Sequence, residues 1–369
     1  MVRIGVVGGG QLARMMIPAS INLGFDLAVF AEEEGSPADL AVSQVGNYRE
    51  ADELEAFART VDVLTFDHEH VPINLLEALV EQGHKVFPPP QALELTHDKI
   101  VMRERLAGLG VPQPAWFTVH SRSDWDRAVE SLGGSCVAKV PTGGYDGKGV
   151  RFVTEWDDIS DWISQGPVLL EQRMNFTREL AQLGARSSTG EWATWPLVET
   201  RQVEGVCSEV LAPAELGAKE SELAKGIALK IAESLGVVGV LAVELFHTDE
   251  GIFVNELAMR PHNSGHIFTE LSATSQFEQH LRAIAGYPLG SPHFVAKCGV
   301  MVNVFSRFDH AAWVVGDGIS SRVKVHDYQK APREGRKAGH VVAVGESQSP
   351  LLASARETAR KLGDARYDD

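Results

Sequence analysis

The alternation of apolar and polar positions predicts two kinds of organisation along the chain. In the N-terminal part, short β-branched runs alternate with segments of helical periodicity, which is typical of βαβ crossovers and a parallel sheet. Strands are predicted at residues 2–7, 27–30 and 61–66, and helices at 11–23 and 73–82. From about residue 297 onward short strands predominate. They are predicted at 299–305, 313–315 and 341–344, before a last helix at about 351–362.

Proline-rich and glycine-rich breaks separate these regions from a central one. Pro88-Pro89-Pro90 marks a boundary, and the run 110–114 breaks the chain again after a helix that starts near Thr96 and runs to about Leu109. The central part has predicted strands at 137–140, 168–172, 195–200 and 206–211, and predicted helices at 215–235 and 274–282. We therefore expect domains at 1–95, 96–292 (with a small flap lobe at about 113–175) and 293–369.

Residues 241–266 carry the most informative pattern. Two apolar runs, 241–246 and 252–257, flank a polar turn, which is a hairpin signature. With the turn centred on Glu250, Glu244 and Glu256 would face each other across the ladder. Like charges in that position destabilise a hairpin unless a cation lies between them. Magnesium is typically held by one or two carboxylates and substrate phosphates, so we predict a metal site here; solvated glutamates on an edge hairpin are the alternative.

Composition narrows the function classes. The 369 residues include 50 acidic side chains against 34 Lys and Arg, a formal net charge of −16, which disfavours non-specific nucleic-acid binding. The three cysteines are widely spaced and form no CxxC pair, so neither a zinc site nor a disulfide framework is predicted. The N-terminal apolar run is short and broken by glycines, unlike a signal peptide, and we find no apolar stretch of about 18 residues. We expect a cytoplasmic protein with no membrane partner.

Two glycine-rich segments could bind phosphate groups. Gly8-Gly9-Gly10 lies between a predicted strand and a helix N-terminus, where free N–H groups favour anions. A nicotinamide cofactor would fit this turn, with residues 32–34 as the ribose-binding acids, and tight strand–helix packing explains the glycines without any ligand. Residues 142–149 follow a strand with four glycines and Lys148, and fit a flap that closes over phosphates rather than a Walker A loop.

With these pieces in order, the chain resembles the ATP-grasp superfamily and, within it, the 5-(carboxyamino)imidazole ribonucleotide synthetase family. The residues that carry the resemblance span nearly the whole chain. They are GGGQLARMM (8–16), TFDHEHVP (65–72), VAKVPTGGYDGKG (137–149), EQRMNFTRE (171–179), NELAMRPHNSGH (255–266), ATSQFEQHLRAIAG (273–286) and HDYQKAPREGRKAGH (326–340). The resemblance implies an α/β ATP-grasp fold with an N-terminal Rossmann-like parallel-sheet domain, a central ATP-grasp module and a small C-terminal β-rich domain.

The resemblance also implies roles for individual residues. Contacts to ATP are implied for Lys99, Lys139, Gly144, Tyr145, Asp146, Gly147, Lys148, Gly149, Glu171, Gln172, Arg173, Met174, Glu179, Gln202, Asn255 and Glu256. Of these, 171–174 would present backbone to adenine and Glu179 would hold ribose. Contacts to 5-aminoimidazole ribonucleotide are implied for Gly10, Gln11, Leu12, Glu69, Tyr145, Asp146, Arg336 and Lys337. Carboxyphosphate chemistry is implied for Arg260, His262, Asn263, Ser264, Lys330 and Asp146, and metal binding for Glu244 and Glu256.

The implied activity is ATP- and bicarbonate-dependent carboxylation of the exocyclic amine of 5-aminoimidazole ribonucleotide, with one or two magnesium ions, or manganese, in a homodimer. Three sequence features depart from the family pattern. Met259 replaces a usual Pro, Gln202 lies where several relatives have His, and 140–142 is less basic. Because side chains alternate along a regular strand, Asn255 is expected to point away from Glu256.

Three alternatives to this activity remain. A formate-dependent glycinamide ribonucleotide transformylase has a related Arg-Pro-His loop, although Asn263-Ser264 favours the carboxylase. An NAD-dependent dehydrogenase would explain the first glycines but not the paired glutamates. A nucleotide sensor without turnover would keep Lys139 and Glu179.

Overall fold

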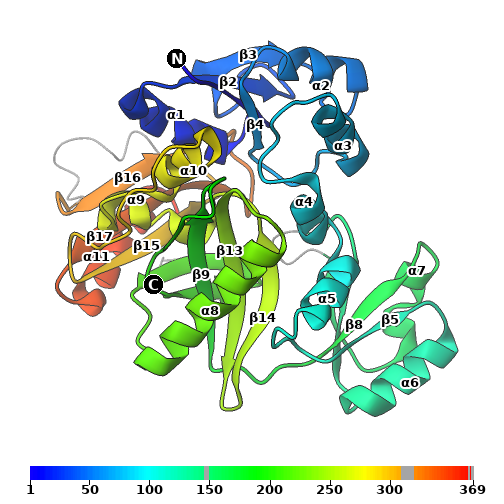
Figure 1. Cartoon of the computed structure of the whole chain (residues 1–369). Coiled ribbons are helices and arrows are strands. Elements are labelled where there is room, and N and C mark those ends of the chain that lie inside the picture. The colour runs from blue at the N-terminus through cyan, green and yellow to red at the C-terminus, as the bar shows by residue number, and fades with distance from the viewer. Residues whose placement is uncertain (145–148, 309–319, 365, 367–369) are drawn as a thin grey trace.

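The computed structural model of the chain describes residues 1–144, 149–308, 320–364 and 366 (Figure 1). The predicted strand at 313–315 lies outside these residues, as do Tyr145, Asp146, Gly147 and Lys148 of the predicted flap. In the described part of the chain, no helix has both the length and the apolar character needed to cross a membrane.

The N-terminal part is built on a parallel four-stranded sheet with the order β3-β2-β1-β4, as its βαβ pattern predicted. Its strands are β1 (Arg3–Val7), β2 (Asp26–Ala31), β3 (Val42–Val45) and β4 (Val63–Phe66). Its helices are α1 (Gln11–Leu23), the 3-10 turn η1 (Asp39–Ala41), α2 (Ala51–Ala58) and α3 (Ile73–Glu81). The carboxyl ends of β1 and β4 both point toward the central module, where ligands of open parallel sheets bind (Figure 1).

The connection to the central module contains two helices where the sequence predicted one. They are α4 (Pro90–His97) and α5 (Lys99–Gly108). The backbone of Asp98 is extended and separates the two helices. The side chain of Asp98 accepts hydrogen bonds from the backbone N–H groups of Ile100 (2.8 Å) and Val101 (3.2 Å). This N-cap satisfies two donors that a helix start leaves free and fixes where Lys99 begins the second helix.

A small antiparallel sheet, with the order β5-β8-β6-β7, forms a separate lobe at the lower right of Figure 1. Its elements are β5 (Trp116–Val119), α6 (Arg122–Leu132), β6 (Cys136–Lys139), β7 (Val150–Val153), η2 (Trp156–Asp158), α7 (Ser160–Ile163) and β8 (Val168–Gln172). Its core packs Trp125 of α6 against apolar side chains of the sheet. The described ends of the predicted flap, Gly144 and Gly149, lie between β6 and β7.

One nine-stranded sheet forms the body of the molecule, with the order β14-β13-β9-β11-β12-β15-β17-β16 and β10 paired to β9. Its first strands are β9 (Arg178–Arg186), β10 (Trp192–Thr194), β11 (Val198–Val203), β12 (Val206–Ala212), β13 (Gly239–Thr248) and β14 (Gly251–Ala258). The C-terminal strands β15 (Cys298–Phe305), β16 (Val323–Asp327) and β17 (Lys337–Gly345) continue the same sheet. Because β12 pairs with β15, the predicted β-rich C-terminal region is joined to the central module through backbone hydrogen bonds.

Helices cover this sheet on both faces. They are α8 (Ala218–Ser234), η3 (Asn263–Gly265), α9 (Phe268–Leu271), α10 (Gln276–Ala285) and α11 (Gln348–Lys361). In Figure 1, α8 lies in front of β9 and β13, and α10 lies between the sheet and α1 of the N-terminal part. The sheet therefore holds the hairpin β13–β14 at one end and the C-terminal strands at the other.

A buried histidine joins the N-terminal part to the large sheet. His280 of α10 accepts a hydrogen bond at Nδ1 from the N–H of Val240 (3.0 Å), and its Nε2 lies 2.8 Å from Thr65 Oγ1 on β4. Because Nδ1 accepts, the ring is neutral with its proton on Nε2, which donates to Thr65. Burial lowers the pKa of His280 from 6.5 to about 3.

We predict that His280 makes the fold sensitive to acid. The unfolded chain takes up a proton on this ring below its ordinary pKa of about 6.5, whereas the folded chain does not until about 3, so this stability is lost as the pH falls through that window. The loss reaches about 3 kcal/mol by pH ~4.5. Melting temperature measured against pH should fall less steeply in His280→Asn than in the wild type. The control His120→Asn, at an exposed histidine, should follow the wild-type curve; equal slopes for all three would contradict the assignment.

Candidate active site

The hairpin β13–β14 contains a bulge at which one polar residue is opposed by two others. Near the turn the strands pair as Thr248 with Gly251, which places Asp249 and Glu250 in the turn rather than Glu250 at its centre. The register shifts between Val243 and Leu245, so Glu244 on β13 is opposed by two residues of β14, Asn255 and Glu256. A bulge of this kind reorients side chains that would alternate in a regular strand. The turn is therefore centred between Asp249 and Glu250 and not on Glu250 as predicted. The bulge adds one residue on β14, and this shift places Glu256 opposite Glu244 as predicted.

The bulge also corrects the expectation that Asn255 points away from the site. Its Oδ1 accepts a hydrogen bond from Lys139 Nζ at 3.0 Å, while Glu244 and Glu256 both line the main cavity of the molecule. Lys139 comes from β6 of the small lobe, so this contact joins the two sheets. Asn255 thus lies beside Lys139, one of the two lysines for which the resemblance implies phosphate binding.

Arg103 of α5 supports the bulge from behind. Its guanidinium is fully buried and donates to the backbone carbonyls of Val254 and Asn255, both at 2.8 Å. It also donates to Glu171 Oε1 at 2.6 Å. The planar fork of an arginine is suited to several acceptors at once, and here it satisfies two neighbouring carbonyl groups of the edge strand β14.

Glu171 lies between two cations in the interior. Its second oxygen accepts from Lys139 Nζ at 2.9 Å, and its side chain is almost wholly buried. Burial raises the pKa of Glu171, but Lys139 and Arg103 outweigh it, so the pKa is held below its usual range. The side chain is committed to these two partners, which leaves the main chain of β8 as the part that could face adenine.

Each glutamate opposed at the bulge lies beside a basic side chain of the chain. Glu256 lies 3.5 Å from Lys99 Nζ, and Glu244 lies 3.1 Å from Nε2 of His262. The Nδ1 atom of His262 lies 2.8 Å from the buried Oγ of Ser264. Burial raises the pKa of Glu244, but the hydrogen bond and charge of His262, together with Lys337 and Lys139, hold that pKa below its usual range. A carboxylate, an imidazole and a hydroxyl are therefore connected in series.

Glu179 of β9 has the opposite electrostatic environment. Burial and the nearby negative charge of Glu244 raise its pKa from 4.5 to about 7, although the side chain of Gln202 donates a hydrogen bond to it. Gln202 therefore contacts a predicted nucleotide residue at the position where several relatives have His.

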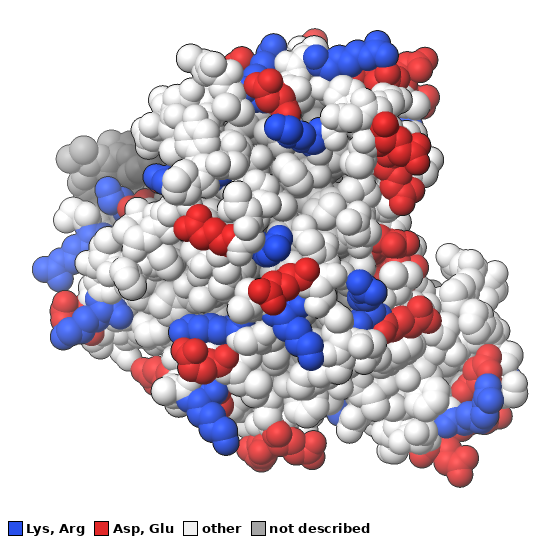
Figure 2. Space-filling view, viewed as in Figure 1, with Lys and Arg blue, Asp and Glu red and all other residues white. Residues whose placement is uncertain are grey.

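The main cavity has a volume of about 860 Å³ and lies where the three parts of the chain meet. Arg260 and Glu69 form an ion pair across it at 2.7 Å. The predicted residues that line the cavity are Gln11, Leu12, Glu69, Lys99, Gly144, Glu244, Glu256, Arg260, His262, Asn263, Lys330, Arg336 and Lys337. The face in Figure 2 shows Lys, Arg, Asp and Glu interspersed. The cavity likewise combines both signs of charge, with basic side chains from all three parts of the chain beside its glutamates.

The first glycine-rich turn is explained by close packing and by carboxylates of the chain itself. A Cβ atom at Gly10 would lie 2.0 Å from Asp67 Oδ2, and one at Gly8, whose φ is +100°, would lie 2.7 Å from His68. Glu32 accepts from the N–H of Gly9 (3.2 Å) and lies 3.1 Å from His68 Nε2. Glu32, which would bind the ribose of a nicotinamide cofactor, is thus already bound to Gly9 and His68.

The segment after the turn faces the cavity. Gln11 contacts Lys330 through its side-chain oxygen, and Leu12 lies beside it. Lys330 also lies over the ring of Tyr328, 5.5 Å from its centroid. The structure thus brings Lys330 from the C-terminal region against the N-terminal part.

Other predicted nucleotide residues lie beyond the main cavity's lining. Gln172 and Arg173 are exposed and Met174 is half-buried, at and after the end of β8. The carbonyl of Gly149, a residue with a φ of +77°, accepts a hydrogen bond from the N–H of Val140 at 2.9 Å. Tyr145, Asp146, Gly147 and Lys148 lie outside the described residues, so their predicted contacts stay predictions.

Several residues that build the site gave no signal in the sequence. Arg103 lies in a charged helix and resembles a surface arginine, and Gln276, which accepts from the N–H of His262 at 2.8 Å, resembles a helix-start polar residue. Asn303 lies in an otherwise apolar strand, and only the structure shows that its amide is buried. Met259, where a Pro was expected, is fully buried in the main core. Its packing therefore fixes the start of the loop that begins at Arg260.

Comparisons with known proteins agree with this geometry. Family models match residues 1–97 (ribonucleotide synthetase preATP-grasp domain), 104–277 (ATP-grasp domain) and 299–354 (phosphoribosylaminoimidazole carboxylase C-terminal domain). N5-carboxyaminoimidazole ribonucleotide synthase of Mycobacterium tuberculosis is 43% identical over 99% of this chain and 89% of the relative. The enzyme of that name from Corynebacterium ammoniagenes is 42% identical over 99% of this chain and 93% of the relative. The chain belongs to the N5-carboxyaminoimidazole ribonucleotide synthase family.

Solved structures show the same relationship. The synthetase of this family from Thermotoga maritima has a TM-score of 0.86 and 34% identity, covering 98% of each chain. The synthase from Aspergillus clavatus, in complex with ADP and 5-aminoimidazole ribonucleotide, has a TM-score of 0.87 and 28% identity, again covering 98% of each chain. The predicted family, fold class and enzyme class, an ATP-dependent carbon–nitrogen ligase, are confirmed. These similarities favour the predicted carboxylase over the dehydrogenase and the formate-dependent transformylase.

Proposed function

We propose how the described residues carry out the reaction of this family, the ATP-dependent carboxylation of 5-aminoimidazole ribonucleotide in de novo purine biosynthesis. The observation that carries the proposal is the bulge opposite Glu244, which joins Lys139 of the small lobe to the hairpin whose residues Glu244 and Glu256 line the cavity. Lys99 and Lys139 would hold ATP phosphates, the backbone at 171–174 adenine, and Glu179 with Gln202 the ribose. The ribotide would occupy the cavity between Gln11, Leu12 and Glu69 on one side and Arg336 and Lys337 on the other.

The donor set at the bulge fits magnesium. The carboxylates of Glu244 and Glu256 both line the cavity, and magnesium takes one or two carboxylates and completes its shell with phosphates and water. Among the residues that the structure describes, no group of three His, Cys, Asp or Glu side chains is placed to hold a metal ion. Glu244 and Glu256 would hold one or two ions, magnesium or manganese, with Asn255 alongside. When bound, the ion would neutralise phosphate charge during phosphoryl transfer.

Bicarbonate would attack the γ-phosphate of ATP in line, forming its new oxygen–phosphorus bond as the bond to ADP breaks. Work of this kind is mainly positioning and electrostatic stabilisation. Arg260 would stabilise the resulting carboxyphosphate, helped by Lys330. The carboxyl group would then pass to the exocyclic amine, which loses a proton as phosphate leaves. His262 is held between Glu244 and Ser264, and Asn263 faces the cavity beside it, so this loop would orient the carboxyl group.

Assembly and location are further parts of the proposal. The family resemblance supports a homodimer in the cytoplasm, and the acidic net charge of −16 supports small molecules rather than nucleic acid as partners. We also propose the domain boundaries 1–95, 96–292 and 293–369. The three matched family models, at 1–97, 104–277 and 299–354, support this division into three parts. Sedimentation equilibrium measures the assembly directly; a monomer at micromolar concentration would overturn the dimer.

We expect ADP release to require ATP, magnesium, bicarbonate and 5-aminoimidazole ribonucleotide together. The assay measures ADP with each component left out in turn, because the proposed sites assign a separate requirement to each. Replacing bicarbonate by formate, and the ribotide by glycinamide ribonucleotide, tests the transformylase. Turnover with that pair, or nucleotide binding without turnover under any condition, would reject the carboxylase. A change in nicotinamide absorbance would instead support the dehydrogenase.

A further inference from the structure

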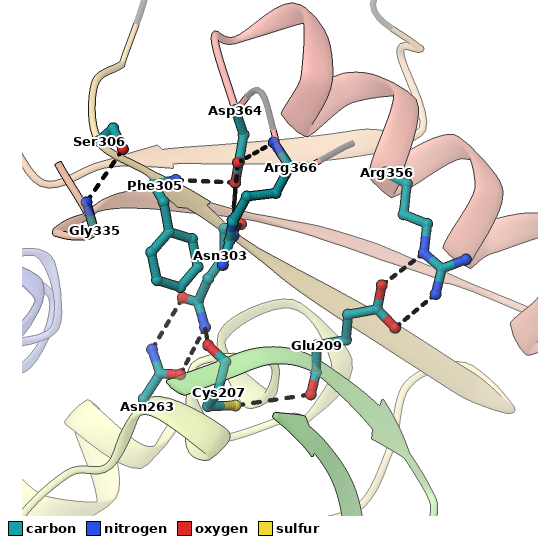
Figure 3. Close-up of polar contacts among 10 residues, drawn as sticks. All are labelled: Cys207, Glu209, Asn263, Asn303, Phe305, Ser306, Gly335, Arg356, Asp364 and Arg366. Carbon is teal, nitrogen blue, oxygen red and sulfur yellow. Dashed lines mark hydrogen bonds and ion pairs between the residues drawn. The ribbon is translucent and has the colours of Figure 1, made fainter. Parts of the chain in front are cut away.

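The end of strand β15 contacts two segments that line the cavity. Asn303 lies in this strand with its side chain fully buried, and Ser306 follows the strand at a φ of +67°. One of the two segments is the loop 262–264 of the central module, and the other is the basic loop 333–337, which leads into β17 and includes its first residue. Figure 3 shows the residues involved.

Asn303 and Asn263 form a reciprocal pair of amide hydrogen bonds. The Nδ2 of Asn263 donates to Oδ1 of Asn303 at 3.1 Å, and the Nδ2 of Asn303 donates to Oδ1 of Asn263 at 2.8 Å (Figure 3). The Nδ2 of Asn303 also donates to the carbonyl of Cys207 on β12 at 2.9 Å. Because a carbonyl can only accept, this third bond fixes which end of the Asn303 amide faces which way. The orientation of Asn263 in the cavity is set in turn.

Ser306 holds the basic loop by three hydrogen bonds. Its N–H donates to the carbonyl of Arg336 at 2.8 Å, and its carbonyl accepts from the N–H of Arg333 at 2.9 Å. Its hydroxyl accepts from the N–H of Gly335 at 3.3 Å (Figure 3). A positive φ is costly for a residue other than glycine, and here it turns all three polar groups of Ser306 toward one loop.

The C-terminal residues hold this strand end in place. Oδ2 of Asp364, a nearly fully buried side chain, accepts from the N–H of Phe305 at 3.1 Å. Arg366 donates to Asp364 Oδ1 at 2.9 Å and to the carbonyl of Asn303 at 3.4 Å, and its guanidinium lies over the ring of Phe305 (Figure 3). Both residues therefore act on the same stretch that contacts the two pocket loops.

We propose that the end of β15 is a positioning element that sets the Asn263 loop and the basic loop relative to each other, and that Asp364 and Arg366 clamp it. The inference rests on the proposed function and adds positioning residues to it: Asn303, Ser306 and the clamp. None of these four lines the cavity, so they act through Asn263 and through Arg336 and Lys337. The clamp would make the carboxylation pocket depend on Asp364 and Arg366, which contact Phe305 and Asn303 at the strand end.

The test compares Asn303→Ala, Ser306→Gly and Arg366→Met in the full-length chain. The control is Arg356→Met, which removes a two-pronged ion pair to Glu209 (2.6 and 2.9 Å) on strand β12, next to β15 (Figure 3). We expect Asn303→Ala to raise the KM for the ribotide or for bicarbonate about tenfold or more, and the other two about two- to fivefold, with the KM for ATP changed less than twofold. Arg356→Met should lower the melting temperature and leave every KM unchanged.

A double-mutant cycle tests whether Asn303 acts through Asn263. If it does, Asn263→Ala combined with Asn303→Ala should be no worse than Asn263→Ala alone, within about twofold. Independent, multiplying losses would overturn the inference, as would variants that lose thermal stability like the control with no change in KM. If Asn303→Ala fails to fold, Arg366→Met and Ser306→Gly test the inference instead. Each should raise the KM for the ribotide or for bicarbonate and leave the KM for ATP changed less than twofold. Bicarbonate dependence of the wild type tests the proposed function separately.

Discussion

Replacing Glu256 by Gln is expected to lower magnesium-dependent ADP release by about 10²- to 10³-fold with the fold intact. The substitution keeps the shape of the side chain but removes one of two carboxylates opposed at the bulge, and loss of metal-held charge stabilisation costs about 3–4 kcal/mol of activation free energy. The amide retains the approximate volume of the carboxylate, so the half-exposed site should still pack. Steady-state ADP release and the magnesium concentration for half-maximal rate are the measurements.

The matched control lies in the same hairpin. Glu250→Gln removes the same charge from an exposed residue in the turn that follows β13, at the opposite end of the hairpin from the bulge. It should leave both the rate and the magnesium requirement within about twofold of the wild type. Wild-type ADP release in Glu256→Gln, or an equal loss in Glu250→Gln, would contradict the proposed metal site.

Local patterns in the sequence were sufficient to predict most elements but not how the strands join. The βαβ region and the hairpin follow from periodicity and turn residues, which act over a few positions. The pairing of β12 with β15 does not, because nothing in either strand specifies a partner 90 residues away. The shared sheet that carries Asn303 toward the loop at Asn263 could therefore be seen only in three dimensions.

The candidate site was predictable where chemistry demands a particular residue type. Paired glutamates in a hairpin and a loop of Arg, His, Asn and Ser are costly or unusual unless they bind something, so they are visible in the sequence. The bulge was not visible, because regular alternation placed Asn255 on the wrong side, and the shift in register that corrects it is stabilised by Arg103 from a distant helix. Residues that support others carry no such signature.

Replacing Arg103 by Met is expected to destabilise the folded chain by about 3–5 kcal/mol. Breaking a buried ion pair leaves its partner charge uncompensated, and Glu171 would keep only Lys139. The carbonyls of Val254 and Asn255 would lose their donor as well. Arg103→Lys should recover only part of the loss, since an ammonium cannot reach the carboxylate and both carbonyls with a planar fork.

Thermal and urea unfolding measure this loss, with Arg105→Met as the control from the same helix. Arg105 is exposed and makes a long hydrogen bond of 3.4 Å to the carbonyl of Ser234, so its removal should cost less than about 0.5 kcal/mol. Because Arg103 fixes the backbone that carries Asn255 and Glu256, Arg103→Lys should also raise the magnesium requirement, whereas Arg105→Met should not. Equal stability of the two methionine variants would mean that the bulge does not depend on Arg103, and the strand would then have to hold its shifted register by its own packing.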